Sequence, residues 1–226
     1  MRNKQRTSFV RSVLKRLLYP FLTFYFKWYL KDKRGFKYKG LKLSVLPGVF
    51  HPNFFLSSKI LMRFLESVDL KNTTLLELGA GSGAVGFYAE KLGAKVTLSD
   101  ISNKAIEGLY QNASKLQSEA TIVHSDLFDT IEASFDYIVI NPPYYPKTPN
   151  SEEEMAWYCG DEFQYFKKLF GQLSSRIASG TSVFMILSED CNLEHIESIA
   201  LTHGLRFELS YQERRMWEWN FIFRIC

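Results

Sequence analysis

A glycine-rich turn between an apolar strand and a helix constrains the fold of this chain more than any other feature. Residues Thr73–Leu78 are mostly apolar and predict a buried strand, whereas Ala84–Leu92 predict a helix. Gly79, Gly81 and Gly83 lie between them. Because glycine has no Cβ, a ligand can approach this backbone closely, and the helix start presents free N–H groups to it. The turn therefore predicts an α/β fold with a ligand near the end of the first strand.

Strands and helices alternate from this turn to the end of the chain, which predicts a doubly wound α/β sheet. In the last segment large apolar residues alternate with mostly polar ones, as in an antiparallel strand. We therefore expect seven strands, mostly parallel, that end in a C-terminal antiparallel hairpin. The expected strands are 73–78, 95–99, 121–124, 136–140, 181–187, 206–211 and 216–225, and the expected helices are 84–92, 103–115, 163–177 and 193–202.

The first forty residues differ in charge from the rest of the chain. They hold 12 Lys and Arg against one acid, Asp32, a balance of +11, whereas the remainder has a balance of −7. Apolar residues at helical spacing between Phe9 and Leu17 predict a basic amphipathic helix. The apolar run that follows, 17–26, contains Pro20 and is too short to span a bilayer. We expect a basic, aromatic, helical extension over 1–42 and a domain over 43–226.

Three interpretations of this extension stay open. It packs as a helical pair on the domain, or residues 1–40 contact nucleic acid, or they contact an anionic membrane. Cys159, Cys191 and Cys226 are far apart, odd in number and without a CxxC pair. They predict reduced thiols in a cytoplasmic protein, with a peripheral position at the inner membrane face as the alternative.

Two acidic residues follow the next two expected strands. Asp100 comes 21 residues after Gly79, where a carboxylate can accept hydrogen bonds from both ribose hydroxyls of an adenosine cofactor. Asp126 is a candidate for the exocyclic amine of adenine, with Leu127 and Phe128 beside the ring; helix capping is the competing interpretation. These features leave a nicotinamide-dependent dehydrogenase open, because the glycines also satisfy GxGxxG.

The four residues Asn141-Pro142-Pro143-Tyr144 indicate the chemistry. They follow a buried strand, and the two prolines end its hydrogen bonding and direct the backbone. The Asn141 side-chain oxygen and the Pro142 carbonyl can accept both hydrogens of an NH₂ group, while Tyr144 stacks on the planar group that carries it. This turns the nitrogen lone pair toward a methyl donor, and positioning alone can lower a barrier by roughly 7–11 kcal/mol.

Together, the glycine turn, the two acids and the NPPY sequence resemble the NPPY branch of the class I S-adenosylmethionine-dependent methyltransferases. The resemblance implies a Rossmann-like methyltransferase fold, S-adenosylmethionine as the cofactor, and N-methylation with Asn141, Pro142 and Tyr144 as the catalytic residues. A dehydrogenase has no use for the NPPY sequence. The residues that the resemblance places at the cofactor are Glu77, Gly79, Gly81, Gly83, Asp100, Ile101, Asp126, Leu127 and Asn141, and those at the acceptor are Phe50, Tyr144 and Tyr145.

The upstream segment 46–52 is similar to two subfamilies. HemK-type enzymes methylate a glutamine of peptide release factors and carry NPPY after a V-F/Y-x-P segment. RsmC-type enzymes methylate a guanine amine of ribosomal RNA and share LPGVF, but usually have Phe at the place of Tyr144. Both acceptors present a planar NH₂ group. The basic extension slightly favours a phosphate-rich substrate, either RNA or a ribosome-associated protein.

The expected function is therefore N-methylation of a macromolecule, with recognition by residues 1–60 and the loop 145–158. Glu152, Glu153 and Glu154 in this loop predict the charged start of a helix or a mobile flap. Two alternatives remain. One is a membrane-surface methyltransferase of a small or lipid-like acceptor, and the other is a non-catalytic module that keeps the cofactor fold.

Overall fold

The computed structural model describes residues 32–53, 56–177, 180–215 and 218–226. The basic amphipathic helix predicted near the N-terminus lies outside the described residues, as does any membrane or nucleic-acid contact made by residues 1–31. No helix within these described ranges has both the length and the apolar character that crossing a membrane requires.

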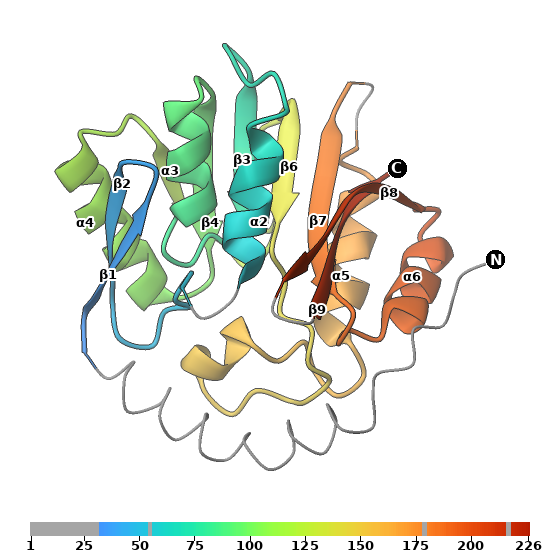
Figure 1. Cartoon of the computed structure of the whole chain (residues 1–226). Coiled ribbons are helices and arrows are strands. Elements are labelled where there is room, and N and C mark those ends of the chain that lie inside the picture. The colour runs from blue at the N-terminus through green and yellow to red at the C-terminus, as the bar shows by residue number, and fades with distance from the viewer. Residues whose placement is uncertain (1–31, 54–55, 178–179, 216–217) are drawn as a thin grey trace.

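A seven-stranded sheet forms the centre of the molecule (Figure 1). Its first five strands are parallel, and the last two form an antiparallel hairpin whose final strand runs antiparallel to its neighbour in the sheet. The predicted sheet, mostly parallel with a C-terminal hairpin, is confirmed. The strands are β3 (Thr74–Leu78), β4 (Lys95–Asp100), β5 (Thr121–His124), β6 (Tyr137–Ile140), β7 (Ser182–Ser188), β8 (Phe207–Arg215) and β9 (Glu218–Ile225), in the order β5-β4-β3-β6-β7-β9-β8.

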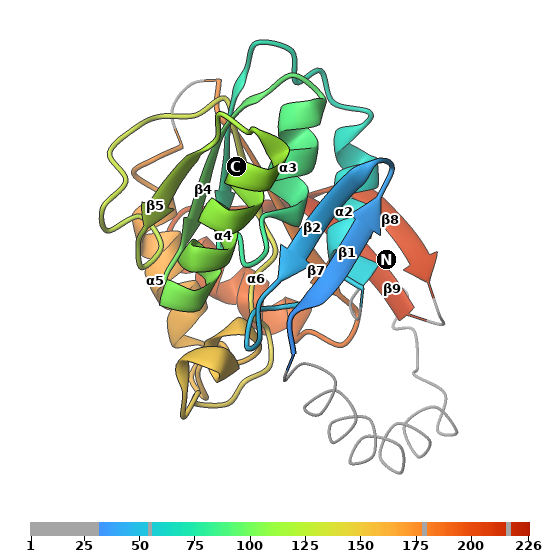
Figure 2. The same ribbon diagram turned by 90° about the vertical axis from the view of Figure 1, so that its left-hand side faces the viewer.

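Helices cover both faces of this sheet and create two hydrophobic cores (Figure 1; Figure 2). Successive side chains of a strand point to opposite faces, so Val139 enters one core while Ile138 and Ile140 enter the other. All three are buried, which explains why the sequence of β6 is continuously apolar. The first core contains α2 (Leu56–Leu65), α3 (Ala84–Lys91) and α4 (Asn103–Leu116), and the second contains α5 (Gln164–Leu173) and α6 (Leu193–Thr202).

A two-stranded hairpin, β1 (Arg34–Tyr38) and β2 (Leu41–Val45), packs beside α3 and α4 (Figure 2). Lys39 and Gly40 at its turn both have positive φ, which matches the right-handed twist of paired strands. The inner face of the β1–β2 hairpin is part of the first core. The domain boundary predicted between residues 42 and 43 falls within β2 and stays a prediction. The buried side chains of the hairpin are Phe36, Leu41, Leu43 and Val45.

One buried side chain joins this hairpin to α4. Asn112, fully buried, accepts a hydrogen bond from the Ser44 N–H at 2.8 Å and donates to the Ser44 carbonyl at 2.8 Å. It also donates to the carbonyl of Ser82, in the glycine turn, at 3.3 Å. Asn112 therefore holds together β2, α4 and the turn that follows β3.

We expect Asn112→Ala to lower the free energy of unfolding by about 2–4 kcal/mol, because the Ser44 N–H and C=O groups lose their partner in a largely dry interface. Urea denaturation followed by circular dichroism measures this change. The neighbouring exposed Gln111→Ala is the control and should change stability by no more than about 0.5 kcal/mol. Equal effects of the two substitutions would contradict the joining role of Asn112.

Candidate active site

The pairing of β3 with β6 sets the position of the site. Leu78 lies opposite Ile140 in this parallel pair, so Gly79 and Asn141 leave the sheet side by side. Strand order reverses here, with β4 and β5 on one side and β7 on the other. Ligands of open α/β sheets bind at such a reversal, beyond the carboxyl ends of the strands. A cavity of about 510 Å³ lies there and is lined by the glycine turn, Asp100 and the NPPY residues.

The glycines of the turn have two different roles. Gly79 and Gly81 have φ of +72° and +53°, and both line the cavity. A Cβ built on Gly79 would meet no atom within 4 Å, so its backbone is open to a ligand. Gly83 is outside the cavity lining. It caps α3, and a Cβ there would come within 2.6 Å of Leu109 and Phe87, so packing explains this glycine.

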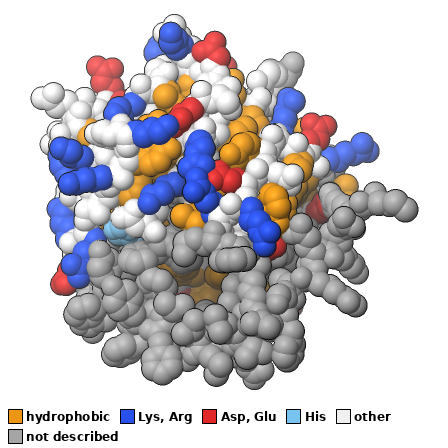
Figure 3. All heavy atoms as spheres, in the orientation of Figure 1, with side chains coloured by type: hydrophobic (Ala, Val, Ile, Leu, Met, Phe, Trp, Pro, Cys, Tyr) orange, Lys and Arg blue, Asp and Glu red, His pale blue; other side chains and the backbone are white. Residues whose placement is uncertain are grey.

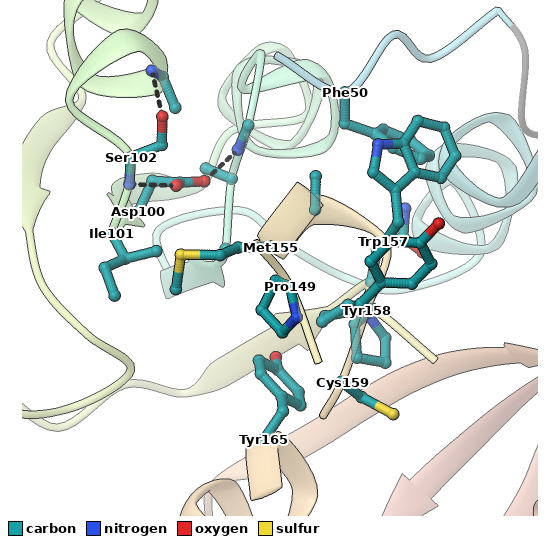
Figure 4. Close-up of a pocket in the computed structure, with 18 of the residues that line it drawn as sticks. Phe50, Asp100, Ile101, Ser102, Pro149, Met155, Trp157, Tyr158, Cys159 and Tyr165 are labelled. Carbon is teal, nitrogen blue, oxygen red and sulfur yellow. Dashed lines mark hydrogen bonds between the residues drawn. The ribbon is translucent and has the colours of Figure 1, made fainter. Parts of the chain in front are cut away.

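Asp100 lies at the end of β4, as predicted from the sequence (Figure 4). One carboxylate oxygen accepts from the Gly81 N–H at 2.7 Å, and the other accepts from the Ser102 N–H at 2.8 Å. Burial raises the pKa of Asp100. A carboxylate oxygen can accept more than one hydrogen bond, so both oxygens retain capacity for a diol. Ile101 follows and lines the same side of the cavity.

Glu77 is a buried acid at the base of the cavity. Its side chain is 6% exposed, and its carboxylate accepts from the Gly86 N–H of α3 at 2.7 Å. Burial raises the pKa of Glu77 to about 8, an effect that the N–H groups of Gly86 and Val85 partly offset and the charge of Asp100 strengthens. Glu77 thus ties β3 to α3.

The raised pKa of Glu77 predicts a pH-dependent stability. Between about pH 4.5 and 8 the folded chain holds a proton that the unfolded chain releases, so Glu77 lowers stability as pH rises through this window. Glu77→Gln keeps an oxygen for the Gly86 N–H without the charge. We expect the melting temperature of this variant, relative to the wild type, to increase steadily from pH 5 to pH 8.5. Exposed Glu132→Gln is the control, and a difference that is constant with pH would contradict the prediction.

Asp126 lines the cavity but already has a partner. Lys168 of α5 donates to Asp126 at 2.6 Å and to Asp129 at 2.7 Å. No helix begins at Asp126 in this described part of the chain, so the competing capping interpretation is not supported. Leu127, with φ of +54°, is buried and lines the cavity beside it. No local pattern pointed to Lys168, because it lies 42 residues from Asp126 in the chain.

Asn141 has its amide oriented by a residue of α2. Asn141 Nδ2 donates to Ser58 Oγ at 3.4 Å, and Ser58 is 4% exposed. This contact turns the NH₂ group of Asn141 toward α2 and leaves Oδ1 as an acceptor for a ligand. The rings of Tyr144 and Tyr145 lie 4.8 Å apart, and both line the cavity. Burial raises the pKa of Tyr144 well above its ordinary value, so its phenol stays neutral.

Residues 145–160, which we call the cover segment, lie across the mouth of the cavity. The N–H of Tyr145 donates to the Trp157 carbonyl at 3.1 Å, and the N–H of Cys159 donates to the Tyr145 carbonyl at 3.0 Å. These bonds fold the segment back on itself. In Figure 4, Asp100, Ile101 and Ser102 lie on one side of the cavity, whereas Phe50, Trp157 and Tyr158 lie on the other.

The acidic part of the cover segment fastens it to α4. Residues Glu152–Ala156 form a short 3₁₀ helix, which confirms the predicted helix start at the three glutamates. Glu152 accepts from the Asn103 N–H at 2.7 Å, and Glu153 pairs with Lys104 at 2.7 Å. A carboxylate is stabilised at the positive end of a helix, and the pKa of Glu152 is accordingly lowered, mainly by its hydrogen bond to Ser102. At the other side, Phe50 contacts Trp157 with ring centroids 5.4 Å apart.

Every predicted site residue except Gly83 therefore lines the cavity. Phe50, Tyr144 and Tyr145, predicted at the acceptor, lie at its aromatic side. Several lining residues were not singled out from the sequence, because they come from helices and loops with no motif of their own. Tyr165 and Lys168 lie outside every region predicted to form the site, whereas five others fall within the ranges 1–60 and 145–158 that were expected to recognise the substrate: Ser58, Pro149, Met155, Trp157 and Tyr158.

The family whose profile matches residues 40–158 is described as "Methyltransferase small domain". The match covers more than half of the chain and includes both the glycine turn and the NPPY residues. The chain belongs to this family. The class I methyltransferase fold and S-adenosylmethionine as the cofactor, both expected from the sequence, are thereby confirmed at the level of the family.

Relatives of two kinds are similar to the chain. The release factor glutamine methyltransferase of Borreliella burgdorferi is 34% identical in an alignment of 194 positions that covers 78% of this chain and 65% of the relative. Ribosomal RNA small subunit methyltransferase C of Vibrio cholerae is 29% identical over 165 residues, 72% of this chain and 44% of the relative. Among such curated relatives the chain spans between 32% and 65% of their length.

A solved structure shows the same fold. It is the 16S rRNA N2-guanine methyltransferase RsmC of Thermus thermophilus in complex with AdoMet and guanosine. The TM-score is 0.62 at 20% identity, over 85% of this chain and 50% of that one. At this identity the likeness concerns the fold alone.

Proposed function

We propose that this chain is an S-adenosylmethionine-dependent N-methyltransferase that acts on a planar amino or amide nitrogen of a macromolecule. The observation that carries the proposal is the place of Asn141. It lies beside the open backbone of Gly79, and its contact with Ser58 leaves Oδ1 as an acceptor. Acceptor and methyl donor would thus meet at the boundary between β3 and β6. The two kinds of relatives, which by name act on a glutamine and on ribosomal RNA, both fit this chemistry.

The cavity residues suit the proposed cofactor. The volume of the cavity, about 510 Å³, is within the usual range of small-molecule sites. Gly79 and Gly81 leave room for a ligand against the backbone, and Asp100 can accept hydrogen bonds from a diol. The Asp100 carboxylate lines the cavity and, when ionised, favours the positively charged sulfonium. When bound, S-adenosylmethionine supplies an activated methyl group.

The residues of the chain act mainly by positioning the acceptor. Asn141 Oδ1 and the Pro142 carbonyl accept the two N–H hydrogens, so that the nitrogen lone pair faces the methyl donor. Neutral Tyr144 stacks on the planar group and does not act as a base at physiological pH. The cover segment, held at Asn103 and Phe50, limits the access of water to the cavity, and the proton that the nitrogen loses on methylation passes to the remaining solvent.

Asn141→Ala should lower the rate of methyl transfer by roughly 10²–10³, the usual effect of losing one preorganised polar contact. The measurement is transfer of labelled methyl from S-adenosylmethionine into an extract of cells that lack the gene. Label released by ribonuclease would indicate an RNA base, and label released by protease would indicate a glutamine. The affinity for S-adenosylhomocysteine should stay within a few-fold of wild type. Near-wild-type transfer by the variant would mean that Asn141 is not at the acceptor.

Asp100→Ala should weaken cofactor binding by roughly 1.5–3 kcal/mol if the carboxylate accepts charge-assisted hydrogen bonds from the ribose. Isothermal titration with S-adenosylhomocysteine measures this change directly and needs no methyl acceptor. Asp69→Ala, an exposed aspartate before β3, is the matched control. The same affinity in both variants would remove Asp100 from the cofactor site.

A further inference from the structure

The outer face of the β1–β2 hairpin is strongly basic. Lys33, Lys37, Lys39 and Lys42 are exposed on it, whereas the apolar residues of both strands point into the core. Lys91, at the end of α3, joins this group because its ammonium donates to the Lys39 carbonyl at 3.0 Å. In Figure 3, Lys and Arg side chains gather on the side of the molecule where this hairpin lies.

Among the described residues, most lysines of this face have no acidic partner. Lys37 lies directly opposite Lys42 in the antiparallel pair, and like charges in this arrangement destabilise a hairpin. Lys39 is paired with Glu66 at 2.6 Å. Within the described residues, no ion pair involves Lys33, Lys37, Lys42 or Lys91. We call Lys33, Lys37, Lys42 and Lys91 the lysine face. An anionic partner would relieve the repulsion between its members.

The lysine face lies within a short length of chain from the candidate active site. β2 ends at Val45, and Gly48, Val49 and Phe50 already line the cavity. Gly48 is six positions after Lys42, so at most about 22 Å of chain joins them. A polymer bound along the hairpin can therefore place one of its units in the cavity within a few repeats.

We propose that the lysine face binds the phosphate backbone of an RNA strand whose base enters the cavity. The inference rests on the proposed function for the methylated base, but the phosphate contact is tested separately. A membrane surface fits less well, because interfacial binding needs exposed apolar groups. In the described part of the chain, large exposed apolar residues are absent from the hairpin. Two large exposed apolar residues, Tyr145 and Met155, line the cavity instead. An unstacked base would need such a stacking surface there.

The test is the salt dependence of RNA binding by full-length Lys37→Gln/Lys42→Gln. Anisotropy of a labelled 20-nucleotide single-stranded RNA gives the affinity between 50 and 200 mM salt. Each phosphate contact on a single strand contributes about 0.7 to the slope of log affinity against log salt, so two lost contacts make the slope shallower by about 1.4. The same relation gives an affinity loss of about 25-fold at 0.1 M salt.

The matched control is Lys167→Gln/Arg206→Gln, which removes the same charge from exposed positions at α5 and at the start of β8. We expect its slope to equal that of the wild type. Both double variants should bind S-adenosylhomocysteine normally. The hairpin variant should melt no lower than the wild type, because the repulsion between Lys37 and Lys42 is removed.

Three outcomes would overturn the inference. One is an equal change of slope in both double variants, which would indicate binding by net charge alone. Another is unchanged RNA affinity together with weaker binding of the hairpin variant to phosphatidylglycerol vesicles, which would indicate a membrane contact. A wild-type RNA slope in the hairpin variant would likewise overturn the inference, whereas absence of methyl transfer by the wild type, with the expected RNA slopes, would count against the proposed function alone.

Discussion

The parallel pairing of β3 with β6 is the constraint on which the site depends. Because Leu78 lies opposite Ile140, the glycine turn and Asn141 emerge from neighbouring strands at the same edge. The same pairing places the reversal of strand order at this boundary, so the helices that follow the strands diverge and leave a crevice. A change of register by one residue would turn buried side chains of β6 to the opposite core and move Asn141 away from Gly79.

Buried polar side chains then position elements outside the sheet and the side chain of Asn141, which strand pairing alone does not determine. Glu77 binds the first turn of α3, Asn112 joins the hairpin to α4, and Ser58 orients the amide of Asn141. Each satisfies a donor or acceptor that burial would otherwise leave without a partner, which is costly in a medium of low dielectric constant. The cover segment closes the remaining side through Glu152 and the contact of Phe50 with Trp157.

The elements of the central sheet were predictable because their signals are local. The apolar runs of β3, β6 and β7 reflect burial on both faces of the sheet, whereas the alternation in β9 places most of its large apolar side chains on one face, and the observed ranges lie close to the expected ones. The hairpin and α2 had not been assigned. Both elements carry apolar residues on one face, and the packing of these faces into the first core beside α3 and α4 is a contact between separate elements. The predicted basic helix of the N-terminal extension stays a prediction.

By itself, the sequence determined the α/β class, the family and the two motifs, since strand periodicity, glycine turns and proline-terminated strands are properties of neighbouring residues. Only the tertiary structure decided which side chains meet across the chain. It separated Gly83, required for packing, from Gly79 and Gly81, which face the cavity. It also paired Lys168 with Asp126 and set Lys37 against Lys42. These contacts join residues from separate elements, and their geometry follows from strand order and packing, which no local pattern encodes.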